Sequence, residues 1–345
     1  MKLSRSKNLR SKNTGLVGAA TALAGLATAA WVALRARRAE REHVPLGRFI
    51  DVDGVRLHYV DHGEGPPVVL LHGNVVSVDD FQASGLIDRL AGEHRVIAFD
   101  RPGFGHSSRP RDRLWTPSAQ AALLHRALAQ LGVLEPAIVV GHSMGTMVAV
   151  AMALDFPSNV RRLVLLGGYY YATARLDAVL TAPVALPVVG DVMRYTVTAL
   201  SARALLSRAV RKMFAPQPVP AAFYPTLSRE MLVRPAQLRA NAEDAALMIP
   251  AAYASSQRHH ELGLPVAILV GEGDKVVDRA AHSLRLHREL SRSMLVEVAG
   301  AGHMVHYAAI DSVVAAVRAS SANVSGVQPS AAPSAGSSSG SVAPS

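Results

Sequence analysis

The chain has 345 residues, half of them hydrophobic, which is enough to bury a large core in one large domain or two small ones. Its formal charge of +10 invites a nucleic-acid interpretation, but residues 1–48 carry ten Lys or Arg against two Glu, which leaves only +2 for the rest. The basic character therefore belongs to the N-terminus, and we expect no nucleic-acid partner. The absence of cysteine excludes disulfides, zinc–thiolate sites and a cysteine nucleophile.

The basic N-terminal segment, residues 1–45, contains a run without a charge from Gly15 to Leu34. Twenty residues at helical rise span about 30 Å, the thickness of a bilayer core. Trp31 near one end of the run suits an interfacial position. We therefore expect residues 15–34 to form an uncleaved signal anchor. The alternatives are a cleaved signal peptide, which the following arginines disfavour, and a helix that packs on the protein surface.

The charges around this run indicate an orientation. Five basic side chains precede it within residues 1–12, and four arginines follow it within residues 35–41. The small excess favours a cytoplasmic N-terminus, with the rest of the chain outside the cytoplasm. A cytoplasmic location is the alternative.

Residues 46–168 alternate between strand and helix patterns. Asp53-Gly54 joins two alternating runs, which predicts a β-hairpin over 49–60. The all-apolar run at 68–71 predicts a strand that is buried on both faces, and further strands are expected at 95–99, 138–142 and 163–166. Helical patterns lie between them, at 81–90 and 118–131 and after Ser143. This rhythm predicts a doubly wound, mostly parallel α/β sheet whose ligands bind at the carboxyl ends of the strands.

Residues 169–260 break the rhythm, because they are helical and divided by prolines, and they predict an inserted helical cap. The rhythm returns in residues 261–320, with strands expected at 266–270 and 294–298 and helices at 279–290 and 308–320. Residues 321–345 contain no charge and consist mainly of Ser, Ala, Gly, Pro and Val, which predicts a disordered tail.

The strand at 138–142 ends in Gly141-His142-Ser143-Met144-Gly145, the sequence form of a nucleophile elbow. In such an elbow a buried strand turns sharply into a helix and exposes the serine hydroxyl at the turn. We expect both glycines to be sterically required, because a side chain would lie where the strand end and the first helical turn pass each other.

Two further residues can activate this serine. Asp274 and His303 each follow a later predicted strand, in glycine-rich loops. A serine needs an imidazole to take its proton, and the imidazole needs a carboxylate to hold its tautomer. Ser143, Asp274 and His303 are therefore the predicted nucleophile, acid and base. Glu272 and Asp278 are the alternatives to Asp274, and His306 is the alternative to His303.

With five matching stretches in order, the chain from about 49 to 320 resembles a capped member of the α/β-hydrolase superfamily, with an eight-stranded sheet. By that resemblance, the backbone N–H groups of Asn74 and Met144 form the oxyanion hole. The epoxide hydrolase and haloalkane dehalogenase branches look similar but use an aspartate nucleophile. The matching stretches are His72-Gly73-Asn74, Asp100-Arg101-Pro102-Gly103-Phe104-Gly105-His106-Ser107, Gly141-His142-Ser143-Met144-Gly145, Gly271-Glu272-Gly273-Asp274 and Gly302-His303-Met304.

A serine nucleophile forms an acyl-enzyme, which suits a carboxylic ester hydrolase, and the apolar cap suggests a lipophilic small-molecule ester. The alternatives are a C–C hydrolase of diketo acids, which would use a cap arginine such as Arg175, Arg194 or Arg234, and a hydrolase-fold protein that binds a small ligand with little turnover. Six cap tyrosines are candidate pocket residues. We expect no cofactor and no metal, and we interpret Glu243-Asp244 and Arg258-His259-His260 as solvated cap surface. The sequence leaves the oligomeric state open.

Overall fold

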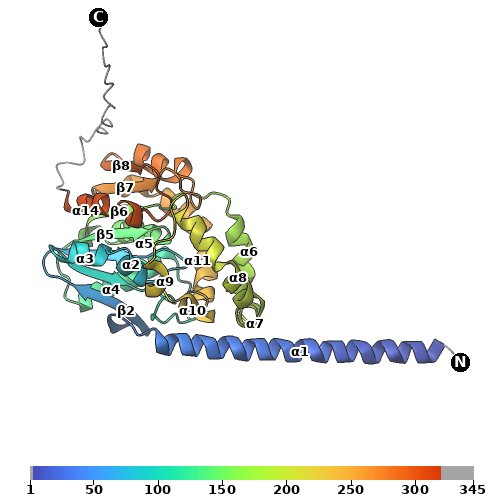
Figure 1. Cartoon of the computed structure of the whole chain (residues 1–345). Helices are drawn as coiled ribbons and strands as arrows, with labels where there is room; N and C mark the ends of the chain where they lie inside the picture. The colour runs from blue at the N-terminus through green and yellow to red at the C-terminus, as the bar shows by residue number, and fades with distance from the viewer. Residues whose placement is uncertain (1–2, 320–345) are drawn as a thin grey trace, which may run out of the picture.

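The computed structural model describes residues 3–319, apart from the side chains of residues 3–16 and of residue 177. The predicted disordered tail, 321–345, lies outside the described residues. One sheet contains eight strands in the order β1-β2-β4-β3-β5-β6-β7-β8 (Figure 1). The strands are β1 (Arg48–Val52), β2 (Val55–His62), β3 (Pro67–Leu71), β4 (Arg95–Phe99), β5 (Ala137–His142), β6 (Val160–Leu166), β7 (Val266–Gly271) and β8 (Ser293–Val298).

The sheet is mixed and mostly parallel. The hairpin strands β1 and β2 pair antiparallel around Asp53-Gly54, and β2 also runs antiparallel to β4. Every pairing from β4 through β3, β5, β6 and β7 to β8 is parallel. The predicted fold class, a doubly wound α/β sheet with an inserted helical region, is confirmed.

Hydrophobic residues on both faces of the sheet form its core. Successive side chains of a strand point to opposite faces, so Val69 and Leu71 of β3 join one cluster and Val68 and Leu70 join the other. The first cluster includes residues of α4 (Pro117–Gln130) and α5 (Met144–Asp155), and the second includes residues of α2 (Asp79–Ala83), α3 (Leu86–Ala91) and α14 (Ile310–Arg318). Helices thus cover both faces, which explains why the central strands read as unbroken apolar runs.

Three helices expected from the sequence are each interrupted. The helix expected at 81–90 is divided into α2 and α3, because Gly85 between them adopts φ 77°, a conformation that ends a right-handed helix. The helix expected at 279–290 begins with a π-helical turn, Ala280–Leu284, before α12 (Arg285–Glu289). The last expected helix is preceded by the short α13 (Val305–Ala308), and the break at Ala309 separates it from α14.

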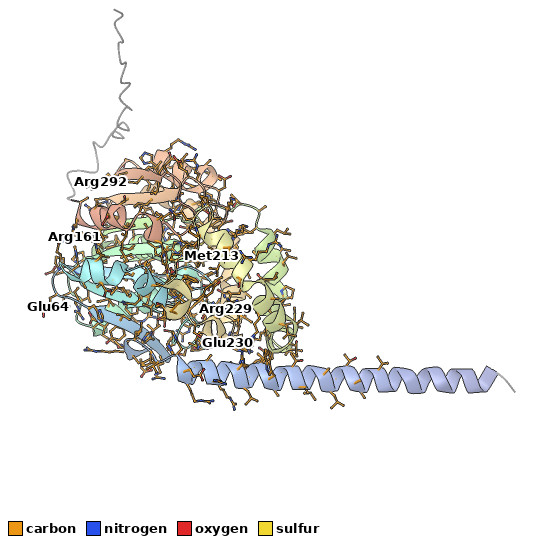
Figure 2. All side chains as sticks on the ribbon, viewed as in Figure 1. Glu64, Arg161, Met213, Arg229, Glu230 and Arg292 are labelled. Carbon is orange, nitrogen blue, oxygen red and sulfur yellow. The ribbon has the colours of Figure 1, made fainter. Side chains whose placement is uncertain are left out.

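Between β6 and β7 the chain is helical, as expected for residues 169–260, although the boundaries of the cap remain predictions. The cap contacts the loop after the last strand, because the carbonyl of Met213 (labelled in Figure 2) accepts a hydrogen bond from the His303 N–H at 3.0 Å. The helices are α6 (Leu176–Ala185), α7 (Val189–Tyr195), α8 (Val197–Phe214), α9 (Phe223–Thr226), α10 (Arg229–Leu232) and α11 (Pro235–Ser256).

The N-terminal segment forms a single helix, α1 (Leu3–Glu42), whose C-terminal part packs on the body while the remainder extends away from it (Figure 1). Val32 and Ala39 are buried, and Arg35 forms an ion pair with Glu230 of α10 at 3.1 Å, close to the end of the helix (Figure 2). In the described part of the chain, Val17–Glu42 is the one unbroken helix long and apolar enough to cross a membrane.

Candidate active site

The structure shows a sharp, strained turn at Ser143. Strand β5 ends at His142 and α5 begins at Met144, and Ser143 between them adopts φ 52° and ψ −119°, a backbone conformation that L-residues rarely occupy. A Cβ at position 141 would lie 2.7 Å from the Gly145 oxygen and the Thr146 Cα, so the first helical turn excludes a side chain there, as expected. A Cβ at position 145, in the first turn of α5, would instead clash with the Leu71 carbonyl of β3. Strand β3 pairs with β5, which leads into α5, and this pairing brings the carbonyl close.

Asp274 and His303 meet at the same edge of the sheet. The His303 Nδ1–H donates to Asp274 Oδ2 at 2.8 Å, and both side chains are buried. Asp274 Oδ1 accepts the N–H groups of Val276 at 2.7 Å and Val277 at 3.0 Å. Burial works to raise the pKa of Asp274, but the charge and hydrogen bond of His303 and the two backbone donors outweigh it and lower the pKa. The carboxylate is therefore ionised at neutral pH.

The alternatives to this pair have other partners. Asp278 is exposed and accepts the Ala281 N–H at 2.9 Å, as a residue that caps the following helical turn does. Glu272 is exposed. His306 is fully buried, and its Nε2–H donates to Asp80 at 2.9 Å. Of the candidate acids and bases, the structure brings Asp274 and His303 together.

The backbone packs closely against both Ser143 and the Asp274–His303 pair at two glycines, and a hydrogen bond of His142 connects the two parts of the site. A Cβ at Gly73 would lie 3.0 Å from the Ser143 Cβ, so the loop after β3 lies directly against the serine. A Cβ at Gly167 would lie 3.2 Å from the His303 Nδ1 and would crowd the pair. The His142 Nε2–H donates to the His303 carbonyl at 3.2 Å, which ties the elbow to the histidine loop.

The two backbone groups expected to form an oxyanion hole are both close to Ser143. Met144 follows it directly as the first residue of α5, and Asn74 follows Gly73 in the adjacent loop. Among the hydrogen bonds of the described turns and loops, the N–H groups of Asn74 and Met144 donate to no acceptor. They are therefore free to bind a ligand oxygen, and the one at Met144 has the added field of a helix N-terminus.

Sequence reasoning missed the residue that holds this loop, Arg101. Its guanidinium is fully buried and donates to the His72 carbonyl at 2.8 Å, the Gly73 carbonyl at 3.1 Å and the Asn74 Oδ1 at 2.7 Å. Its backbone N–H donates to the His72 Nε2 at 3.0 Å, while the His72 Nδ1–H donates to the Gly73 carbonyl at 2.7 Å. His72 is thus held as one neutral tautomer, and Arg101 fixes the loop that carries the Asn74 N–H.

The same guanidinium connects the core to the cap. Arg101 Nη1 donates to Asp244 Oδ2 of α11 at 2.5 Å, and Arg109 Nη2 donates to the other oxygen at 2.9 Å. The interpretation of Glu243-Asp244 as solvated surface is wrong for Asp244, which is 0% exposed. The sequence contained one usable signal: an arginine two residues after a buried strand, within a motif that the resemblance already included, needs a buried acid as a partner.

We expect Asp244→Asn to lower the free energy of unfolding by about 3 kcal/mol, because it removes the acid that pairs with the buried Arg101 and leaves Arg109 with Glu243 alone. Urea unfolding would measure the loss. The control is Glu243→Gln, the neighbouring acid, whose ion pair with Arg109 is partly exposed and is expected to contribute less than about 1 kcal/mol. Equal effects of the two substitutions would contradict the role given to the Asp244 pair.

The interpretation of Arg258-His259-His260 as surface is also wrong in part, because His259 is buried and His260 is exposed. Burial lowers the pKa of His259 to about 4, and it does the same for His72 and for His282. All three are therefore neutral in the folded chain at pH 7, whereas in an unfolded chain they titrate near pH 6.5.

The free energy of unfolding is consequently expected to decrease as the pH is lowered. Between about pH 6.5 and 4 these histidines bind protons in the unfolded chain but stay neutral in the folded chain. Their contribution to stability is therefore fully present above pH 6.5 and is lost as the pH falls towards 4. Each histidine contributes at most about 1.4 kcal/mol per pH unit. Melting temperatures between pH 7.5 and 4.5 would measure the slope. His259→Gln should flatten it and His260→Gln should not; equal slopes in both variants and the wild type would contradict the assignment.

One further group of side chains has the chemistry of metal ligands. Asp80, His142 and His306 are buried, and one ligand atom from each lies within 4.8 Å of the others. The Asp80 carboxylate already accepts hydrogen bonds from His306 at 2.9 Å and from the Tyr307 hydroxyl at 2.9 Å. Protein donors thus satisfy this carboxylate, and we interpret the cluster as support beneath the His303 loop.

Comparison with known proteins agrees with this architecture. Residues 66–309 match a family described as alpha/beta hydrolase fold. The chain is 37% identical over 140 residues to a 2-hydroxymuconate semialdehyde hydrolase of Pseudomonas sp. (strain CF600), a match that covers 39% of this chain and 48% of that protein. The chain therefore spans about half the length of this curated relative.

Solved structures are similar over more of the chain. An alpha/beta hydrolase fold protein from Burkholderia ambifaria has a TM-score of 0.68 at 24% identity and covers 80% of this chain and 98% of its own. A bacterial membrane phospholipase A has a TM-score of 0.59 at 22% identity and covers 91% of this chain and 100% of its own. At these identities the likeness is one of fold. Together with the family match over residues 66–309, it shows that the chain belongs to the α/β-hydrolase fold family.

Proposed function

We propose that this protein is a serine hydrolase that cleaves a lipophilic carboxylic ester. Ser143 Oγ attacks the ester carbonyl carbon and its proton passes to His303. The tetrahedral oxyanion is held by the N–H groups of Asn74 and Met144. Collapse expels the alcohol, which takes the proton from His303, and leaves an acyl-enzyme. Water then attacks the acyl group with His303 as the base and releases the acid. These steps require no cofactor.

The observation that carries this proposal is the Asp274–His303 hydrogen bond at the strand edge where the strained Ser143 lies. Asp274 accepts the Nδ1–H of His303, which leaves Nε2 as the proton acceptor, the tautomer that a general base needs. The lowered pKa of Asp274 keeps a negative charge beside the imidazolium that forms during the reaction. The two N–H groups without an acceptor supply the electrostatic stabilisation, for which one donor in comparable sites is worth about 10²–10³ in rate.

The preference for a lipophilic ester is supported by the apolar surroundings of the elbow. Met144 and Met147 of α5 pack with Tyr169 and with Met248 of α11 in one buried cluster. Methionine adapts to irregular apolar groups, so this cluster suits an acyl chain or an apolar alcohol better than a charged one. Of the six cap tyrosines, Tyr169 is in this cluster. Tyr171 belongs to the hydrophobic cluster that α4 and α5 form with one face of the sheet, and Tyr253 is exposed.

A C–C hydrolase of diketo acids is the second candidate, favoured by the likeness to 2-hydroxymuconate semialdehyde hydrolase. That chemistry would use a cationic residue for the substrate carboxylate. Arg194 is paired with Asp191 at 2.6 Å and Arg234 with Glu40 at 3.1 Å, and the Arg175 guanidinium lies 5.6 Å from the centre of the Tyr169 ring. These engagements of the candidate arginines support the ester over the diketo acid.

The two candidates are separated by a substrate panel of nitrophenyl esters of increasing chain length, an amide and a diketo acid. We expect hydrolysis that favours the longer esters and labelling of Ser143 by a fluorophosphonate. Hydrolysis of the diketo acid alone would favour the C–C candidate. Neither hydrolysis nor labelling would leave a small-ligand binding protein with little turnover as the interpretation.

We also propose that residues 15–34 of α1 anchor the protein in a membrane, with the catalytic body on the extracytoplasmic side. The exposed apolar helix supports an anchor, and the five basic residues before the run against four after it support the orientation. Cell fractionation tests the anchor: full-length protein should stay with the membrane after a carbonate wash, and its complete recovery in the soluble fraction would refute the anchor.

A further inference from the structure

The cap presents an unusually apolar outer surface. Ten large apolar side chains of residues 176–205 are exposed, half of all such side chains in the part of the chain whose burial is described. We call this surface the cap face. Exposed apolar patches on folded domains commonly mark sites that bind another protein or a membrane. Its members are Leu176, Val179 and Leu180 of α6, Leu186 and Val188 of the following turn, Val189 and Val192 of α7, and Val197, Leu200 and Leu205 of α8.

From residue 178 onwards, the charged side chains of the cap face form ion pairs. Residues 178–205 contain one acid, Asp191, and two arginines, Arg194 and Arg203. Asp191 forms ion pairs with Arg111 and Arg194, and Arg203 pairs with Glu230 at 2.5 Å. Pairing lowers the cost of bringing such groups to an apolar partner. Residues 178–205 can therefore approach a low-dielectric environment without exposing a lone charge to it.

The position of α1 identifies that environment. Trp31 lies beside the cap, with the Arg203 guanidinium 5.0 Å from the centre of its ring, and the rest of α1 extends away from the body beyond this point. In Figure 1, helices α6, α7 and α8 lie on the side of the body towards which α1 extends. If residues 15–34 cross a bilayer along its normal, Trp31 is at the interface, and the membrane surface meets these three helices.

The cap helices have dimensions that suit the interface. Ala178–Ala185 and Val189–Tyr195 are together apolar enough for a span, but they are bent by 106° relative to each other. Each is only about two turns long, or roughly 12 Å, which is too short to cross a bilayer of about 30 Å. Short apolar helices with a bend between them can instead lie in the boundary between headgroups and acyl chains.

We propose that the cap face docks on the lipid bilayer that α1 crosses, so that α6, α7 and the start of α8 lie in the headgroup region. The inference rests on the proposed anchor and deepens the proposed esterase function: the substrate is a lipophilic ester that partitions into the membrane and reaches the cap from the lipid side. The bound surface would keep the cap next to the source of substrate.

The chain has no cysteine, so single cysteines can be introduced and labelled at chosen positions. We would reconstitute the full chain in phosphatidylcholine vesicles and place a fluorescent label at Val179→Cys, Val192→Cys, Leu26→Cys of α1, or Leu134→Cys. Leu134 is 88% exposed in the loop before β5, at the amino edge of the sheet, and is the matched control. Lipids that carry a quencher in the acyl chain should quench the labels at 26, 179 and 192 but not the label at 134.

Each other result overturns the proposal in a distinguishable way. Quenching at 26 with none at 179 and 192 would show an anchored protein whose cap stands clear of the lipid. No quenching at any of the three positions would reject both the anchor and the docked cap. Protection of 179 and 192 from a water-soluble quencher without quenching by the lipid would indicate a second copy of the chain on this face.

Charged variants test the consequence for catalysis. Val179→Glu with Val192→Glu should lower hydrolysis of a long-chain nitrophenyl ester held in vesicles about tenfold, because charges replace two exposed valines that the lipid would cover. Hydrolysis of a short, water-soluble nitrophenyl ester should be unchanged, as in the control Leu134→Glu. Unchanged hydrolysis of the vesicle-held ester would overturn the proposal. If the wild type hydrolyses neither ester, the proposed function fails, and the labelling experiment still decides the docking.

Discussion

Replacing Ser143 with alanine is expected to lower the turnover of the best ester substrate by up to about a millionfold. The loss is this large because the whole acyl-enzyme pathway depends on one oxygen atom, that of Ser143. Some rate above the uncatalysed reaction should remain, since the N–H groups of Asn74 and Met144 can still polarise a bound carbonyl and assist a direct attack by water. Steady-state kinetics at high enzyme concentration would measure the residual rate.

The control for this substitution is a serine outside the site. Ser158 is exposed in the turn after α5, and Ser158→Ala should leave kcat and KM unchanged. Alanine at 143 retains a Cβ in the strained conformation at φ 52°, so the melting temperature of Ser143→Ala should stay close to that of the wild type. An activity that falls by less than about a hundredfold in a folded Ser143→Ala protein would mean that another group is the nucleophile.

Local signals predicted the parts of the fold that depend on neighbouring residues. The strands were predictable because a strand that is covered on both faces must be apolar along its length, as β3 and β7 are. The elbow was predictable for a similar reason, since a glycine at 141 is the residue that fits beside Thr146. In both cases the requirement acts within a few residues along the chain, and the sequence displays it directly.

Contacts between distant residues were not predictable in the same way. Arg101 and Asp244 are separated by 143 positions, and no spacing rule connects an arginine after β4 to an acid in the middle of α11. The pattern of α11 also misled, because an acidic pair on a helix is most often solvated, and here one of the two acids is fully buried. The burial of a charge depends on the partner that arrives from elsewhere in the fold, which a single sequence does not reveal.

The helix breaks show the same limit on a smaller scale. A glycine within a helical pattern is tolerated in many helices, so Ser84-Gly85 in the sequence did not decide between one helix and two. In the structure, Gly85 adopts a positive φ and separates α2 from α3. The short α2 carries Asp80, which accepts a hydrogen bond from His306, a contact that spans 226 positions.

A comparison of Asp274→Asn with Asp278→Asn tests the predicted acid. Asparagine at 274 can present its amide nitrogen to the His303 Nδ1 and favour the tautomer with the proton on Nε2, which cannot accept a proton from Ser143. It also removes the negative charge that stabilises the imidazolium. In a serine protease the equivalent change lowers kcat by about 10⁴-fold, and we expect a loss of this order for Asp274→Asn.

Asp278→Asn is the matched control, because it makes the same chemical change four residues away. Asparagine caps a helix about as well as aspartate does, so the hydrogen bond to the Ala281 N–H can be kept and kcat should change by less than a few-fold. Both variants should be measured with the same ester and their folding checked by thermal melting. If Asp278→Asn were the more damaging of the two, Asp278 would be the acid and the Asp274–His303 hydrogen bond would serve only to hold the loop. If instead Asp274→Asn alone abolishes turnover without lowering the melting temperature, the charge of Asp274 acts in the reaction and not merely in the fold.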